Sequence, residues 1–342
     1  MNKRSWNTLR IGMFAFSVGI STLVAANGIA APPRISDTYA EPGQWVTVAQ
    51  GRKINLRCAG NGPQTVLLEA GSHADSTTWF RVQPLLAASI KVCSYDRAGY
   101  GFSDMGPLPR NLDADVADLH DLVHHANLKT PLVLVGHSLG SNIVRRFTQL
   151  YPAEVGGLVL IDPPAQDVAS FAPEWAKIET AMNAQRFDFV RRCESGAEQR
   201  VLKSPPPELK GCVAGDNPLA SDKVNAATAS YKIKPAFWRT LLSELQDNVV
   251  VFGQAISPGE KHGSLPLIVL TATTTYADAP PDVRKHLEAA RDQTQARIVA
   301  TSTRGERQVV DNASHDIQLE QPEAVATAII KVIGEMRETT AR

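Results

Sequence analysis

The chain has 342 residues, with 35 Lys and Arg against 35 Asp and Glu, and 43% of its residues are hydrophobic. This length predicts two domains of ~150 residues each, or one large α/β domain that carries an insertion. The hydrophobic content and a charged share of 20% exclude wholesale disorder. A formal net charge of zero provides no basic surface for phosphates, so we expect no nucleic-acid partner. These properties favour a compact protein, and we expect an enzyme.

The first 30 residues have the layout of a secretory signal peptide. Basic residues at the start precede an uncharged, mostly apolar run over 11–26, which small residues and then Pro32 and Pro33 follow. We expect a cleaved signal peptide over 1–30, a secreted or periplasmic protein, and no stable membrane insertion after cleavage. The alternative is a retained membrane anchor, because the run is slightly short for a span of ~20 residues and slightly long for a signal peptide.

The four cysteines form an even set that an oxidising compartment allows to pair. Cys193 and Cys212 bracket a short proline-containing stretch, and a bridge there would close a loop of ~20 residues and contribute ~3 kcal/mol. This pairing leaves Cys58 with Cys93. The alternative is four buried free thiols. We expect no zinc site, because neither a Cys-x-x-Cys nor a pair of histidines lies near these cysteines.

Apolar periodicity predicts strands that alternate with helices along most of the chain. Strands are expected at 44–50, 52–58, 65–69, 90–95, 131–135, 157–161, 265–271 and 308–310. Helices are expected at 77–88, 113–128, 139–150, 283–300 and 321–336. This alternation predicts an α/β fold with a doubly wound, mostly parallel sheet. The core would comprise 35–162 and 264–338.

The segment 163–263 interrupts the alternation, because it has helical stretches at 174–192 and 235–249 but no pattern of a buried strand. We predict a helical cap over the strand ends, inserted between two strands. Its aromatic residues would hold a hydrophobic acyl or alcohol group, or would form the core of the cap itself. They are Phe171, Trp175, Phe187, Phe189, Phe237 and Trp238.

The most informative motif is Gly136-His137-Ser138-Leu139-Gly140, which lies directly after an expected strand and before an expected helix. It has the form of a nucleophile elbow, Gly-x-Ser-x-Gly, in its strand–turn–helix context. Ser138 must occupy a sharp, strained turn, and Gly136 and Gly140 leave the space that this turn needs. We expect His137 to be structural, since neighbouring side chains on so tight a turn point apart.

Together with three further segments, this motif resembles the α/β-hydrolase superfamily, in its capped, exported esterase-like branch. The other segments are VLLEAGSHADSTTW (66–79), YDRAGYGFSD (95–104) and ASHDIQLEQPEAV (313–325), and all four follow the order of the superfamily. The resemblance implies the α/β-hydrolase fold, a Cys58–Cys93 bridge between neighbouring strands, and neither a cofactor nor a metal. A serine at position 138 argues against the dehalogenase and epoxide-hydrolase branches, which need a carboxylate there.

His315 is the candidate base, because it follows the last expected strand and precedes the last helix, which is the position of the catalytic histidine in the superfamily. The histidines at 120, 124, 125 and 286 fall in expected helices, and we expect them to face solvent.

The oxyanion needs two preorganised N–H donors. Leu139, the residue after the nucleophile, supplies one. The resemblance places the second in the loop after VLLEA, where similar enzymes carry His-Gly-x. This sequence has Ala70-Gly71-Ser72 there, so the second donor is predicted to be the N–H of Ser72.

Two residues are candidates for the acid that orients His315. Most of the superfamily places it after the strand expected at 265–271, where this chain has Asp278 several residues late and without the usual glycine. A minority places it at the end of the previous strand, where this chain has Asp162. We prefer Asp162, because its carboxylate would emerge at the carboxyl edge of the sheet.

These residues predict a serine hydrolase that cleaves carboxylic esters of small molecules through an acyl-enzyme on Ser138. One alternative is a capped aminopeptidase or amidase with the same triad. The other is a non-catalytic binding protein on the same fold, which would normally have lost Ser138 or His315. The substrate and the oligomeric state are not predicted, because fold does not set them.

Overall fold

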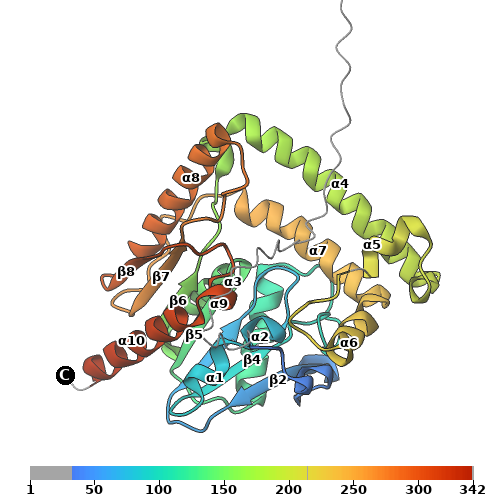
Figure 1. The fold of residues 1–342 in the computed structure, drawn as a ribbon. Coiled ribbons are helices and arrows are strands. Elements are labelled where there is room, and N and C mark those ends of the chain that lie inside the picture. The colour runs from blue at the N-terminus through green and yellow to red at the C-terminus, as the bar shows by residue number, and fades with distance from the viewer. Residues whose placement is uncertain (1–32, 214, 341–342) are drawn as a thin grey trace, which may run out of the picture.

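A computed structural model describes residues 33–213 and 215–340 of the chain, and its centre is one eight-stranded sheet (Figure 1). In the sheet the strands lie in the order β1-β2-β4-β3-β5-β6-β7-β8. Their bounds are β1 Gln44–Thr47, β2 Lys53–Ala59, β3 Thr65–Glu69, β4 Lys91–Tyr95, β5 Leu132–His137, β6 Val155–Ile161, β7 Leu267–Ala272 and β8 Gly305–Val310. The signal peptide expected over 1–30 lies outside the described residues.

The sheet is mostly parallel. Strand β2 pairs in antiparallel fashion with β1 and β4, and the pairs from β4 to β8 are parallel. Every residue of β3, β5 and β7 is buried, as expected for strands covered on both faces. This arrangement confirms the predicted fold class.

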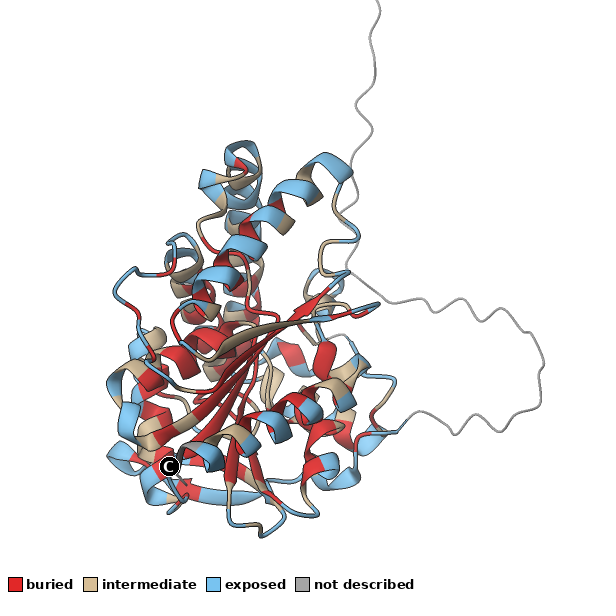
Figure 2. Ribbon diagram, turned by 90° about the vertical axis from the view of Figure 1, so that its left-hand side faces the viewer, coloured by how far each residue is buried: buried red, intermediate tan, exposed pale blue. Residues whose placement is uncertain are grey.

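Helices cover both faces of the sheet, and Figure 2 shows the buried strands between helices whose outer sides are exposed. On one face, α2, α3 and α8 pack against alternate strand residues such as Leu134 and Leu160. On the other, α1, α9 and α10 pack against the intervening residues such as Val135 and Val159. The helices are α1 Val82–Leu86, α2 Leu112–His125, α3 Leu139–Leu150, α8 Pro281–Val299, α9 Ile317–Glu320 and α10 Pro322–Thr340.

The segment between β6 and β7 contains helices and, among its described residues, no strand. Its helices are α4 Pro173–Glu198, α5 Lys210–Val213, α6 Asp222–Lys232 and α7 Pro235–Phe252. Figure 1 shows α4 and α7 running together past the end of the sheet. Four of the six aromatic residues singled out in the sequence lie in the hydrophobic core of this insertion, with Phe237 and Trp238 buried and Phe187 and Phe189 partly buried. For these four residues, the packing favours the second of the two roles considered above, which is to form the core of the insertion itself.

Both expected disulfides are present. Cys58 on β2 lies directly opposite Cys93 on β4, and the two are bonded. Cys193 and Cys212 join α4 to α5 within the insertion. The alternative of free thiols is therefore wrong, since the four cysteines of the chain are all paired.

The structure differs from the expected elements in several places. The strand expected over 44–50 ends at Thr47, before a 3-10 turn, η2 (Ala49–Gly51), and the short α9 was not expected. The helix expected over 77–88 is divided into a 3-10 turn, η3 (Ser76–Trp79), and the short α1. The Asp75 side chain accepts a hydrogen bond from the N–H of Thr77 at 2.9 Å. This bond caps η3, so the segment begins as a 3-10 turn and not as an α-helix. The sequence also gave no indication of α6, because this helix is polar and its one fully buried residue is Val224.

Within the described residues, no helix combines the length and apolar character needed to cross a membrane.

Candidate active site

Ser138 lies on the turn between β5 and α3, with φ 52° and ψ −121°. A positive φ is costly for a residue with a Cβ, so the surrounding structure must hold this turn. The N–H of Ser138 donates to the carbonyl oxygen of Ile161 on β6 at 3.0 Å. The Ser138 side chain makes no capping hydrogen bond to α3, which leaves the hydroxyl free for other chemistry.

Three glycines make the turn possible. A Cβ on Gly136 would lie 2.4 Å from the carbonyl oxygen of Gly140, and a Cβ on Gly140 would lie 2.5 Å from that of Glu69. A Cβ on Gly71 would lie 3.3 Å from the Cβ of Ser138. Gly136 and Gly140 therefore have the steric role expected from the motif, and Gly71 brings the loop after β3 against the nucleophile.

His315 lies between β8 and α9, and its Nδ1 is 2.8 Å from Oδ2 of Asp162. Asp162 directly follows β6, and its side chain is 1% exposed. Because a carboxylate accepts, Nδ1 carries the proton and Nε2 is left for proton transfer. Asp278 is exposed in the loop after β7 and makes no hydrogen bond to His315. Of the two candidate acids, the structure thus places Asp162 beside the histidine.

Several donors hold the Asp162 carboxylate in its ionised form. Thr275 Oγ1 donates to Oδ2 at 2.7 Å, and the N–H of Ala272 donates to Oδ1 at 3.2 Å. Burial opposes ionisation, but the hydrogen bond and the charge of His315 outweigh it and hold the pKa of Asp162 below its ordinary value. For His315, burial disfavours the charged ring, yet the Asp162 carboxylate outweighs this effect and raises the pKa of the imidazole.

His137 has the structural position that the sequence predicts. Its Nε2 donates to the main-chain carbonyl oxygen of His315 at 2.9 Å. Burial, together with the nearby His315 ring, lowers the pKa of His137 to about 4. The ring is therefore neutral near pH 7, and it ties the elbow to the loop that carries His315.

The two expected oxyanion donors belong to the first turn of α3 and to the loop after β3, which Gly71 brings close to Ser138. Leu139 begins α3, whose first amides have no partner within the helix. Arg97 Nη2 donates to the carbonyl oxygen of Gly71 at 2.8 Å. Because C=O and N–H point in opposite directions across a trans peptide, this bond turns the N–H of Ser72 away from Arg97. No described residue accepts a hydrogen bond from the N–H of Ser72, so this donor is available.

The sequence did not reveal the side chains that hold this loop. Arg97 is buried and bonds to Glu69 Oε1 and to Glu244 Oε2 of α7, each at 2.8 Å. Oε1 of Glu244 in turn accepts from the hydroxyl of Ser72 at 2.6 Å and from the N–H of His73 at 2.8 Å. Arg97 lies in the segment YDRAGYGFSD, which could have drawn attention to it, but nothing in the sequence of α7 marks Glu244 as its partner.

Opposing effects set the charges of this network. Burial raises the pKa of Glu69 to about 7. Burial acts in the same direction on Glu244, but Arg97 and the hydrogen bonds to its carboxylate outweigh it and lower the pKa of Glu244. Of the two acids, Glu244 is therefore the one that stays ionised opposite Arg97. It also connects the insertion to the loop that carries Ser72.

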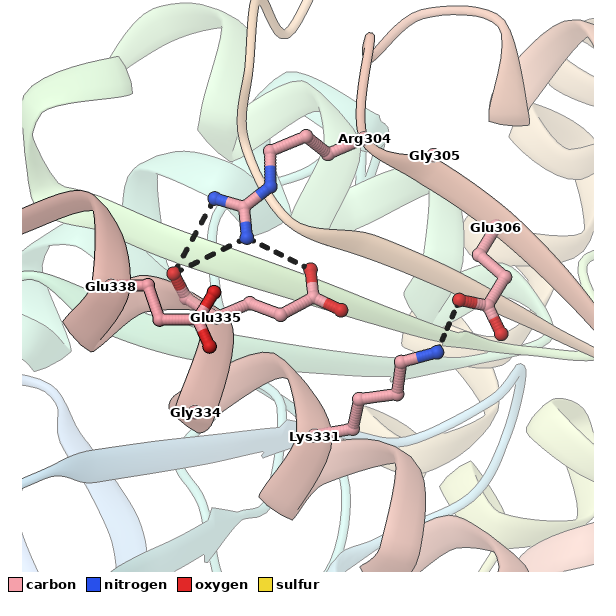
Figure 3. Close-up of a pocket in the computed structure, with 7 residues that line it drawn as sticks. All are labelled: Arg304, Gly305, Glu306, Lys331, Gly334, Glu335 and Glu338. Atoms are coloured by element: carbon pink, nitrogen blue, oxygen red, sulfur yellow. Dashed lines mark hydrogen bonds and ion pairs between the residues drawn. The ribbon is translucent and has the colours of Figure 1, made fainter.

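A separate hollow lies between β8 and α10, remote from Ser138 (Figure 3). Four of its charged side chains form two ion pairs, Arg304 with Glu335 at 3.2 Å and Lys331 with Glu306. Since β8 begins at Gly305, this hollow is at the amino end of the strand. Ser138, Asp162 and His315 follow the carboxyl ends of β5, β6 and β8, where sites of open α/β sheets form.

The chain is similar in structure to several solved hydrolases. They include a thermophilic esterase from Thermogutta terrifontis (21% identity, TM-score 0.55, 86% of this chain and 98% of that chain) and the epoxide hydrolase CorEH (17% identity, TM-score 0.61, 86% and 98%). A third is CarC, a serine hydrolase involved in carbazole degradation (19% identity, TM-score 0.57, 85% and 98%). At these identities the likeness shows the fold alone.

Relatives in sequence share shorter segments. YqjL of Bacillus subtilis (strain 168) is 33% identical over 112 residues, which are 33% of this chain and 44% of that protein. VTE7 of Arabidopsis thaliana, an α/β hydrolase domain-containing protein, is 38% identical over 94 residues, 25% of this chain and 27% of that protein. The match thus spans less than half of these relatives.

The model of the alpha/beta hydrolase family matches residues 66–328, most of the chain. The chain therefore belongs to the α/β-hydrolase family.

Proposed function

We propose that this protein is a serine hydrolase that cleaves carboxylic esters of small molecules through an acyl-enzyme on Ser138. The observation that carries the proposal is the hydrogen bond from His315 Nδ1 to the buried Asp162 carboxylate, in a loop whose main chain is bonded by His137, the residue directly before Ser138 on the strained strand–helix turn. A base oriented by a carboxylate, next to a free hydroxyl, is the arrangement that activates a serine nucleophile.

In the first half of the reaction, Oγ of Ser138 attacks the ester carbonyl carbon and its proton passes to Nε2 of His315. The N–H groups of Leu139 and Ser72 stabilise the oxyanion. The C–O bond then breaks, the alcohol leaves with the proton from His315, and the acyl group remains on Ser138. In the second half, His315 takes a proton from water, the hydroxide attacks the acyl carbon, and Ser138 regains its proton as the carboxylic acid leaves.

The nucleophile separates this proposal from other chemistries on the same fold. Epoxide hydrolases and dehalogenases of the superfamily use a carboxylate as nucleophile, and this chain has the Ser138 hydroxyl there. Amide hydrolysis by the same triad is the alternative. We propose that residues 163–263 act as a cap over the core, 35–162 and 264–338, and that this cap sets the acyl and alcohol preference.

Activity-based labelling tests the proposal directly. A fluorophosphonate probe should label the folded protein at Ser138, and Ser138→Ala and His315→Ala should each abolish hydrolysis of acyl esters while the fold is kept. A series of acyl chain lengths, assayed beside aminoacyl amides, decides between ester and amide cleavage. Labelling at another serine, or none in folded protein, would refute the assignment.

We also propose that the chain is exported and loses residues 1–30. The signal-like leader and the two disulfides support this proposal. Intact-mass measurement of exported protein should place the new N-terminus between about residues 27 and 32, with no thiol alkylated before reduction. A retained leader would instead support a membrane anchor.

A further inference from the structure

Away from the proposed active site, three side chains of α2 and η4 (Pro152–Glu154) converge on one point. Nε2 of His120 and Nε2 of His124 are 3.0 Å apart, and each is 3.2 Å from Oε1 of Glu154. The two histidines are one helical turn apart on α2, so they share a face. Glu154 comes from the connection between α3 and β6.

Hydrogen bonds alone do not satisfy this triangle of atoms. Each Nε2 carries either one proton or one lone pair, and the ionised Glu154 oxygen carries no proton. If both rings donate to Glu154, two N–H groups face each other between His120 and His124. If His124 donates to His120 instead, the lone pair of His120 faces the carboxylate oxygen. With Glu154 ionised, at least one of the three contacts is therefore repulsive, whichever protons the two rings carry.

One cation in contact with all three atoms removes this conflict, because each atom then presents a lone pair to it. Zn²⁺ binds imidazole nitrogen and carboxylate oxygen at ~2.0–2.2 Å, which places adjacent tetrahedral ligands ~3.3 Å apart. The separations of 3.0 and 3.2 Å fit this geometry. Oε2 of Glu154 is buried and has no hydrogen-bond partner, so this carboxylate has a free oxygen for an ion or a bound water.

The neighbouring residues hold the ring of His120 in place, while the side of the cluster next to His124 is open to solvent. The ring of His120 stacks on Tyr151, with centroids 3.8 Å apart and planes 14° apart, so it is more buried than a solvent-facing helical histidine. The side chain of His124 is 53% exposed, which leaves room for a water ligand in the remaining position.

We propose that His120, His124 and Glu154 form a binding site for one divalent transition-metal ion of the Zn²⁺ type. The ion clamps α2 to the end of α3. It lies far from Ser138, because the 12 residues of α3 separate Ser138 from Tyr151, a rise of ~18 Å. It therefore stabilises the fold and takes no part in ester hydrolysis.

Calorimetric titration of tag-free, metal-free protein with ZnSO₄ tests the site. One ion per chain should bind, and zinc should raise the thermal midpoint by a few degrees. His124→Ala and Glu154→Gln should each weaken binding at least ~10-fold and remove the thermal shift. His125→Ala is the matched control: this neighbouring histidine is exposed and contacts the carbonyl oxygen of Asp121, so zinc binding should persist.

Because His124 is half exposed, His124→Ala should fold normally, and circular dichroism checks this. Co²⁺ provides an independent spectroscopic measurement, since a bound ion should give a visible absorption that His124→Ala loses. Absence of saturable zinc binding by the wild-type protein would overturn the proposal. Equal affinities in the wild-type protein and His124→Ala would overturn it as well.

Discussion

The imidazole of His137 donates from Nε2 to the main-chain carbonyl oxygen of His315 at 2.9 Å. The residue directly before the proposed nucleophile thus holds the residue proposed as its base. The two rings lie with centroids 4.8 Å apart, and His137 is buried and neutral near pH 7. This bond fixes the backbone of the loop between β8 and α9 relative to the elbow.

We therefore expect His137→Ala to lower kcat by up to ~10²-fold, because a small displacement of a catalytic group is costly. KM should change little, since His137 has no proposed contact with substrate. Loss of a buried hydrogen bond should also destabilise the fold by ~1–3 kcal/mol. Steady-state kinetics and thermal unfolding measure the two effects separately.

His137→Gln provides the matched control, because its amide N–H₂ can donate to the same carbonyl oxygen. It should recover part of kcat. If His137→Ala unfolds earlier but turns over at the wild-type rate, the ring has only a packing role.

The second prediction concerns the acid. Asp162→Asn should keep the fold and lower kcat by several orders of magnitude, ~10⁴-fold by analogy with known triads, because the amide stabilises the wrong tautomer of His315. Asp278→Asn should have little effect, since Asp278 is exposed. Measurement of kcat and the thermal midpoint for both variants checks this. Loss of turnover in Asp278→Asn alone would show that the commoner family position supplies the acid.

How much of this site follows from the sequence depends on the range of the contacts involved. Ser138 and His315 lie in local motifs, and the strand that precedes Asp162 is visible as an apolar run. The choice between Asp162 and Asp278 depends on how β6 packs beside β7. There the N–H of Asp162 donates to the carbonyl oxygen of Leu270, which holds Asp162 at the end of the sheet. Sequence order alone left both possible.

The support of the oxyanion loop was not predictable. Arg97 and Glu244 are 147 positions apart, and their contact depends on how α7 of the insertion lies against the sheet. Periodicity predicts that α7 is a helix, but not which face meets Arg97. An ion pair between two buried side chains so far apart in the sequence becomes visible only when the fold gives the position of both residues.

The third prediction is a pH dependence. His315 must be neutral to accept the proton of Ser138, and Asp162 raises its pKa above the ordinary value of 6.5. The ratio kcat/KM should therefore fall as the pH decreases through a pKa above 6.5. His137, with a pKa of about 4, should not contribute to this limb.

Stability should change in the opposite direction. A raised pKa means that His315 stabilises the fold below its unfolded pKa and loses this contribution as the pH rises through the folded pKa.

The variant Asp162→Asn tests the assignment of the activity limb to His315. In this variant the carboxylate is gone and burial still disfavours the charge, so the acid limb of the residual kcat/KM should move to lower pH. A limb that stays in place would assign it to another group.

The last prediction tests the link between the insertion and the oxyanion loop. Glu244→Gln keeps the size of the side chain but removes the negative charge that pairs with Arg97 at 2.8 Å. Arg97 then holds the carbonyl oxygen of Gly71 less firmly, and the N–H of Ser72 is less well oriented. Removal of an oxyanion donor costs ~10²–10³-fold in kcat, so we expect a smaller loss of ~10-fold or more. The buried pair should also cost ~3–5 kcal/mol of stability when it is broken.

Glu260→Gln separates orientation from stability, because Glu260 forms a comparable buried ion pair with Arg145 of α3. It should lower the thermal midpoint by a similar amount and leave kcat close to that of the wild-type protein, since neither residue touches the loop that carries Ser72. A loss of kcat confined to Glu244→Gln would indicate that the charge on α7 orients the oxyanion donor. Equal losses of kcat in the two variants, in step with their thermal midpoints, would show that the Glu244–Arg97 pair acts on stability alone.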